Sequence, residues 1–79
     1  MSLVTTVLLA DKYGPRMNLE QMSAALSIPK GTLYQRIALG TLGIPTYQDG
    51  KYRFAATEDV AAYLDGLRDQ ARRAMEAAA

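Results

Sequence analysis

Seven side chains in the middle of the chain can hold an anion or recognise hydrogen-bonding groups. They are four cations and three uncharged polar residues: Lys30, Thr32, Tyr34, Gln35, Arg36, Lys51 and Arg53. The 79 residues include no histidine and no cysteine, which excludes disulfides, the usual zinc sites and thiol or imidazole chemistry. The sequence also contains no glycine-rich phosphate loop and no isolated carboxylate pair. We therefore expect a protein that is not an enzyme, has no cofactor or metal, and acts by non-covalent binding.

Charge is unevenly distributed, although the net charge is only +1. Residues 1–29 are neutral, residues 30–56 carry a net +3, and residues 57–79 carry a net −2. A local excess of positive charge is typical of a surface that contacts nucleic-acid phosphates. A mixed, solvated surface can show the same distribution, and this alternative stays open.

Two short helices joined by a tight turn are predicted near the centre. Apolar residues recur at the spacing of a helix with one buried face at Leu19, Met22, Ala25 and Leu26. Asn18 is a good N-cap for this helix, and Gln21 three residues later can complete a capping-box-like pair. Ser27-Ile28-Pro29 breaks this helix, and a second helix over 30–39 directs Leu33 and Ile37 inward.

The segment from Ile44 to Phe54 predicts a β-hairpin, because two alternating runs flank Asp49-Gly50. A two-residue loop at Asp49-Gly50 pairs Gln48 with Lys51 and Tyr47 with Tyr52. One face then carries residues that can bury: Pro45, Tyr47, Tyr52 and Phe54. The opposite face is polar and carries Thr46, Gln48, Lys51 and Arg53.

The two ends of the chain are expected to be helical. Leu3 to Tyr13 predicts a helix closed by Gly14 and Pro15, with a strand as the alternative for the β-branched start. A helix over about 58–76 follows Thr57 as N-cap. Its apolar residues have the spacing of a coiled-coil seam at Val60, Leu64, Leu67, Ala71, Ala74 and Ala78. The seam can form a dimer. We favour the alternative, in which Val60, Tyr63, Leu64 and Leu67 dock on the helix pair and the alanine-rich end frays.

Together these elements predict a single domain over 1–79, mainly α with one β-hairpin: a winged helix-turn-helix with the helix pair at about 18–40 and the wing at about 44–54. Such domains usually bind double-stranded DNA. On a helical wheel Thr32 and Gln35 point away from the core, toward base edges. Tyr34 and Arg36 lie on the flanks and Lys30 at the start of the helix, suited to phosphates, with Lys51 and Arg53 contributed by the wing. For Tyr34, packing against the wing is the alternative.

Four segments carry a resemblance to known proteins: Leu8 to Gly14, Asn18 to Glu20, Gly31 to Ile37 and Asp59 to Asp65. They resemble small phage and genomic-island regulators, namely the AlpA-type, excisionase-like and pyocin-activator proteins with MerR-like winged helices. The resemblance implies DNA binding by the recognition helix and wing, in transcription regulation or in DNA recombination as an excisionase-like bending factor. The implied partners are a recombinase or RNA polymerase.

The expected state is a monomer or weak dimer, with several copies on adjacent sites. No apolar run approaches the roughly 20 residues of a membrane span, and the expected location is the bacterial cytoplasm, with the nucleoid. An interaction module that grips another protein with the helix-turn-helix surface, like an anti-repressor, is the alternative function.

Overall fold

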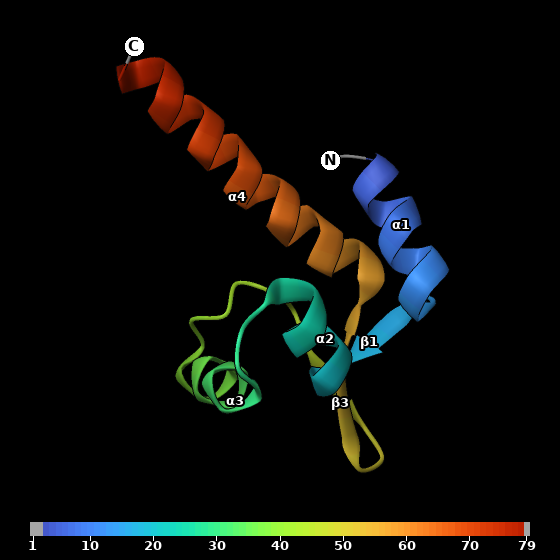
Figure 1. Ribbon diagram of the computed structural model, residues 1–79. Helices are drawn as coiled ribbons and strands as arrows, with labels where there is room; N and C mark the ends of the chain where they lie inside the picture. The colour runs from blue at the N-terminus through green and yellow to red at the C-terminus, as the bar shows by residue number, and fades with distance from the viewer. Residues whose placement is uncertain (1–2, 79) are drawn as a thin grey trace.

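The computed structural model describes residues 3–78, most of which are helical. The helices are α1 (Leu3–Tyr13), α2 (Leu19–Leu26), α3 (Lys30–Leu39) and α4 (Thr57–Ala78). Three short strands, β1 (Arg16–Asn18), β2 (Tyr47–Asp49) and β3 (Tyr52–Ala56), form an antiparallel sheet in the order β1-β3-β2. The hairpin of β2 and β3 projects at one end of the molecule, and the N-terminal end of α1 and the C-terminal end of α4 lie toward the other (Figure 1).

Local signals define α2, as predicted. The side-chain oxygen of Asn18 accepts a hydrogen bond from the Gln21 N–H at 2.9 Å, and the Gln21 side chain accepts one from the Asn18 N–H at 2.9 Å. This capping box satisfies two N–H groups that the first turn leaves free. At the other end Ser27 adopts a left-handed conformation with φ 57°. Three residues then connect α2 to α3, whose predicted bounds are confirmed.

The core lies where α2, α3, α4 and the sheet meet. Its buried hydrophobic residues are Met17, Leu19, Met22, Leu33, Leu42, Ile44, Ala55 and Val60. Leu33 is fully buried and Ile37 packs against the cluster, as the helical spacing predicts. Burying a side chain the size of Leu33 stabilises the fold by roughly 1.5–3 kcal/mol. The core therefore fixes the orientation of α3.

The strand β1 is not expected from the sequence. It pairs with β3 through Arg16–Ala56, Met17–Ala55 and Asn18–Phe54. Both Met17 and Ala55 are fully buried. A two-stranded hairpin alone is marginally stable in water, and a third strand with an apolar face gives it support. The expectation of a single β-hairpin is therefore too simple, since the sheet has three strands.

The predicted hairpin register is wrong. Tyr47 pairs with Phe54, Gln48 with Arg53 and Asp49 with Tyr52, so the loop is Gly50-Lys51. A type I′ turn at Asp49-Gly50 needs a left-handed conformation at both residues. In the structure only Gly50 has a positive φ, of 66°, as a type II′ turn requires of its first loop residue. The first strand also begins at Tyr47 rather than at Ile44.

The burial predicted for one hairpin face is wrong for three of its four residues, since only Phe54 is half-buried. Tyr47 is 44 % exposed and Tyr52 is 64 % exposed, and Pro45 is also exposed. Directly paired residues share a face, so Gln48 and Arg53 lie on the side of Met17 and Ala55. The core therefore packs on the face predicted to be solvent-facing, and Tyr47 and Tyr52 are exposed because they lie on the opposite face of the hairpin.

The helices at the two ends pack against each other. The Thr57 hydroxyl donates to the Gly14 carbonyl at 2.7 Å, and the Thr57 N–H donates to the Pro15 carbonyl at 3.1 Å. Thr57 is therefore the first residue of α4, whereas the sequence predicts it as the N-cap that precedes the helix. Its two hydrogen bonds connect the start of α4 to the residues that follow α1. The whole of Leu3–Tyr13 is helical, which excludes the strand alternative.

The 22 residues of α4 make a helix roughly 33 Å long at 1.5 Å per residue. Val60 is buried, and Tyr63 and Leu64 are half-buried, as the favoured docking interpretation predicts. Leu67 does not dock, being 45 % exposed, and the alanine-rich end is helical as far as Ala78 and exposed to solvent. Across residues 3–78, no helix combines the length and apolar character needed to cross a membrane.

Candidate functional site

A hollow of about 360 Å³ lies between the helix pair and the hairpin. β1 ends at Asn18 opposite Phe54, where the chain turns into α2, so the outer part of β3 has no strand on that side. The start of α2 and one side of α3 face this free edge. The hollow is lined by Asn18, Leu19, Glu20, Lys30, Tyr34, Lys51, Tyr52 and Arg53.

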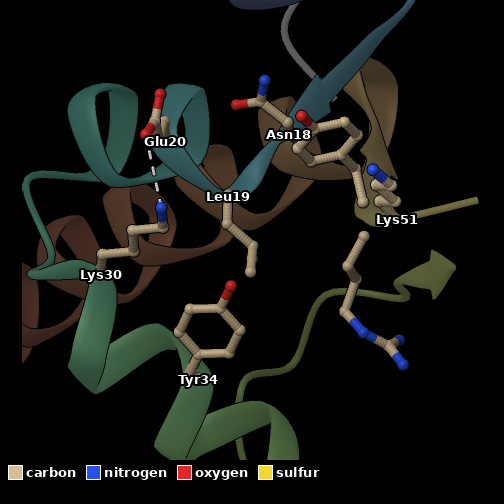
Figure 2. A pocket seen from close by; sticks show the side chains of 8 residues that line it. Asn18, Leu19, Glu20, Lys30, Tyr34 and Lys51 are labelled. Carbon is tan, nitrogen blue, oxygen red and sulfur yellow. Dashed lines mark hydrogen bonds and ion pairs between the residues drawn. The ribbon is translucent and has the colours of Figure 1, made fainter.

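Helix α3 contributes Lys30 and Tyr34, which lie four residues apart and share a helix face. The buried Leu33 directs this face toward the hollow. Tyr34 rises from α3 toward Leu19 at the start of α2, with Lys51 on the hairpin side (Figure 2). Tyr34 is 55 % exposed, so its ring is available to a ligand and is not buried against the hairpin.

The hairpin contributes Lys51, which is an exposed loop residue, and Arg53, which is half-buried. The Arg53 Nη1 donates to the Thr46 hydroxyl oxygen at 2.9 Å. A guanidinium has five N–H donors, so this bond orients Arg53 and leaves donors for a ligand. Within residues 3–78, neither Lys51 nor Arg53 has a carboxylate at ion-pair distance.

Glu20 places one negative charge in the hollow. Its Oε1 lies 3.4 Å from the Lys30 Nζ, and the side chains are 78 % and 47 % exposed, respectively. An ion pair this exposed contributes at most about 1 kcal/mol to stability. A competing anion can therefore displace the Glu20 carboxylate from Lys30 at little cost in free energy. The same carboxylate repels that anion and so weakens its binding at Lys30.

On the other side of the sheet, Arg16 pairs with Asp49 at 2.8 Å and stacks over Phe54, 3.8 Å from the ring centroid. Hydrogen bonds to Asp49 and then Tyr47 raise the pKa of Arg16 above its ordinary value. Asp49 is the sole acid among residues 30–56. Its pairing with Arg16 leaves the positive charge of Lys51 and Arg53 uncompensated.

The structure brings together four of the seven predicted residues, Lys30, Tyr34, Lys51 and Arg53. Gln35 is exposed on the side of α3 opposite Leu33. Thr32 and Arg36 are half-buried and do not line the hollow. On a helix with 100° between residues they lie on the flank away from Tyr34.

Sequence reasoning missed four lining residues: Asn18, Leu19, Glu20 and Tyr52. The capping pattern at Asn18 predicts where α2 begins, and it gives no signal that this helix start lines a hollow. Tyr52 was assigned to a buried face. Its position beside the turn, far from the core-forming Ala55, is the signal that it stays exposed.

Residues 3–78 contain no group of three or more acidic, histidine or cysteine side chains placed to hold a metal ion. In comparisons with protein-family models, with curated proteins and with solved structures, nothing matches this chain.

Proposed function

We propose that this chain is a winged helix-turn-helix protein that binds double-stranded DNA. In this proposal α2 and α3 are the helix-turn-helix, α3 is the recognition helix, and the β2–β3 hairpin is the wing. The observation that carries the proposal is the convergence of Lys30 and Tyr34 from α3 with Lys51 and Arg53 from the hairpin on one hollow. A groove that presents cations from two walls suits a phosphate backbone lying between them.

The roles divide by chemistry. Lys51 and Arg53 contact phosphates, and the Tyr34 hydroxyl donates a hydrogen bond to the same strand. Gln35 projects from α3 away from the core and reaches base edges in the major groove, where an amide pairs with adenine. Thr32 and Arg36, on the flank away from the wing, contact the groove or backbone on the other side of α3.

The biological role that we propose is that of a regulator encoded by a phage or mobile element, without enzymatic activity. It binds repeated sites and bends them, either to assemble a recombinase complex or to act at a promoter with RNA polymerase. A helix in one groove and a wing beside it grip the duplex on two sides, which offsets the few kcal/mol that bending costs.

The test is a salt titration of binding to a labelled duplex, followed by fluorescence anisotropy. The logarithm of the binding constant should fall linearly with the logarithm of salt concentration. Each phosphate contact adds about −0.9 to the slope, so Lys51 and Arg53 together give about −2 or steeper. Absence of binding at low salt, or affinity that does not change with salt, would overturn the proposal in favour of a protein-interaction module.

A further inference from the structure

The two most exposed tyrosines of the chain both line the hollow. Tyr34 on α3 is 55 % exposed and Tyr52 on β3 is 64 % exposed, and no other tyrosine exceeds the 44 % of Tyr47. Within residues 3–78, neither Tyr34 nor Tyr52 makes a ring contact or a side-chain hydrogen bond, whereas the Tyr47 ring lies 6.2 Å from that of Phe54. An aromatic ring buries a large area when it meets a partner, so two open rings in one hollow indicate a ligand.

The two rings come from different walls of the hollow. Tyr34 is on the α3 wall, one turn after Lys30, and Tyr52 is on the hairpin wall. Tyr52 and Arg53 point to opposite faces of the sheet, as successive strand residues do. Both still line the hollow, because no strand covers the outer edge of β3 on that side. Each wall therefore presents one aromatic ring together with a cation.

The size of the hollow and its other lining groups fit a nucleotide. A cavity of about 150 Å³ holds a six-membered aromatic ring, so the hollow of about 360 Å³ has room for a base and its sugar. Leu19 adds an apolar contact. Asn18 and Glu20 add an amide and a carboxylate that can form hydrogen bonds with the edge of a base.

We propose that the hollow binds an unpaired nucleotide of a single nucleic-acid strand, with the base against Tyr34 and Tyr52 and the phosphates on Lys51 and Arg53. In a duplex the neighbouring pairs cover both faces of each base, so only an unpaired base presents a face to the tyrosines. The inference rests on the proposed function only in that the same two cations hold phosphate. Duplex phosphates require no aromatic ring.

The charge of the hollow favours a strand over a free nucleotide. Lys30 is on one wall, and Lys51 and Arg53 are on the other. A strand carries a phosphate on each side of every internal base, whereas a free mononucleotide carries phosphate on one side only. Proteins that bind single strands combine a basic groove with aromatic rings on which bases stack, which is the combination that the two walls provide.

The experiment measures binding of the full chain to a labelled oligothymidylate by fluorescence anisotropy. The emission of the protein should fall on binding, since the chain contains tyrosine and no tryptophan. Tyr34→Leu and Tyr52→Leu should each weaken binding about fivefold or more, and Tyr34→Phe, which keeps the ring, should bind as the wild-type chain does. Tyr47→Leu is the matched control, because Tyr47 is an exposed tyrosine of the same hairpin outside the hollow.

A wholly abasic strand of the same length carries the same phosphates and should bind about fivefold or more weakly than the intact strand. Circular dichroism checks that each variant folds, and Tyr52→Thr replaces Tyr52→Leu if that variant does not, because threonine suits a strand. Equal binding of the abasic strand would overturn the inference. So would Tyr34 and Tyr52 variants that bind as the Tyr47 variant does, or free thymidine monophosphate that binds as tightly as the strand.

Duplex binding separates this inference from the proposed function. Tyr52→Leu should leave the affinity for a duplex unchanged, whereas replacing Lys51 and Arg53 with alanine should weaken binding to strand and duplex alike. A chain that binds the strand but no duplex would contradict the proposed function alone. A chain that binds the duplex and does not distinguish the intact from the abasic strand would contradict this inference alone.

Discussion

The Lys30 ammonium lies 3.4 Å from the Glu20 carboxylate, and both side chains line the hollow between the helix pair and the hairpin. The pair joins the first turns of α2 and α3. It places a negative charge on a surface whose other charged residues, Lys51 and Arg53, are positive. Glu20 therefore restrains the attraction of any anion to this surface.

Glu20→Gln should tighten binding to duplexes of any sequence several-fold at low salt. The substitution frees Lys30 for a phosphate and removes a repulsive charge, so the salt slope should steepen by about one unit. Glu76→Gln is the control, because it changes the net charge equally on the exposed end of α4. Equal effects of the two variants would show that only net charge matters.

Replacing Lys51 and Arg53 with alanine should weaken binding to all duplexes alike and flatten the salt slope by roughly one unit per lost contact. The matched variant Arg72→Ala/Arg73→Ala removes the same charge from α4 and should leave the slope unchanged. Thr46→Val removes the hydroxyl oxygen that accepts the Arg53 hydrogen bond. This variant therefore disturbs the orientation of the Arg53 guanidinium while keeping its charge. If the wing variant binds with the wild-type slope, the hairpin does not contact DNA.

Gln35→Ala should relax the preference at one base pair by about 1–3 kcal/mol, with little change in non-specific affinity. The reason is that Gln35 is exposed on the side of α3 opposite the buried Leu33. Selection of binding sites from random duplexes measures the change. If the Gln35 variant selects the same motif as the wild-type chain, base recognition must be assigned to Lys30 or Arg36 instead.

Gly50→Ala and Gly66→Ala should have opposite effects on stability. No heavy atom lies within 4 Å of the added Cβ at either position, so backbone conformation decides the sign. Gly50 has a φ of 66° in the hairpin loop, where alanine costs about 1 kcal/mol or more. Gly66 lies inside α4, where alanine stabilises a helix by roughly 0.5–1 kcal/mol. Urea unfolding followed by circular dichroism measures both, and a shift in the same direction would contradict this account.

Bending of the duplex is expected if the proposed role is correct. Fragments that carry the binding site at different positions should differ in gel mobility when bound, with the lowest mobility for a central site. Uniform mobility together with protection of a single palindrome would indicate a regulator that binds without bending.

Local sequence signals determine the helices and the existence of the hairpin. The capping pair Asn18 and Gln21, the spacing of Leu33 and Ile37, and Gly14 at the end of α1 act between residues close in sequence, so each is readable from a short window. A count of charged residues shows separately that positive charge gathers in residues 30–56. The local pattern alone does not determine which of the seven predicted site residues lie together in the folded protein.

Tertiary contacts decide the rest. The strand β1 has three residues and no periodicity to detect, and it exists because Met17 is buried against Ala55, far along the chain. The hairpin register follows from Gly50, which alone in the loop adopts a positive φ. Tyr47 and Tyr52 stay exposed because they lie on the face of the sheet opposite Met17 and Ala55. The hollow lined by Lys30, Tyr34, Lys51 and Arg53 depends on where β1 ends relative to β3. Such relationships join segments distant in sequence, and packing free energy rather than local preference selects them.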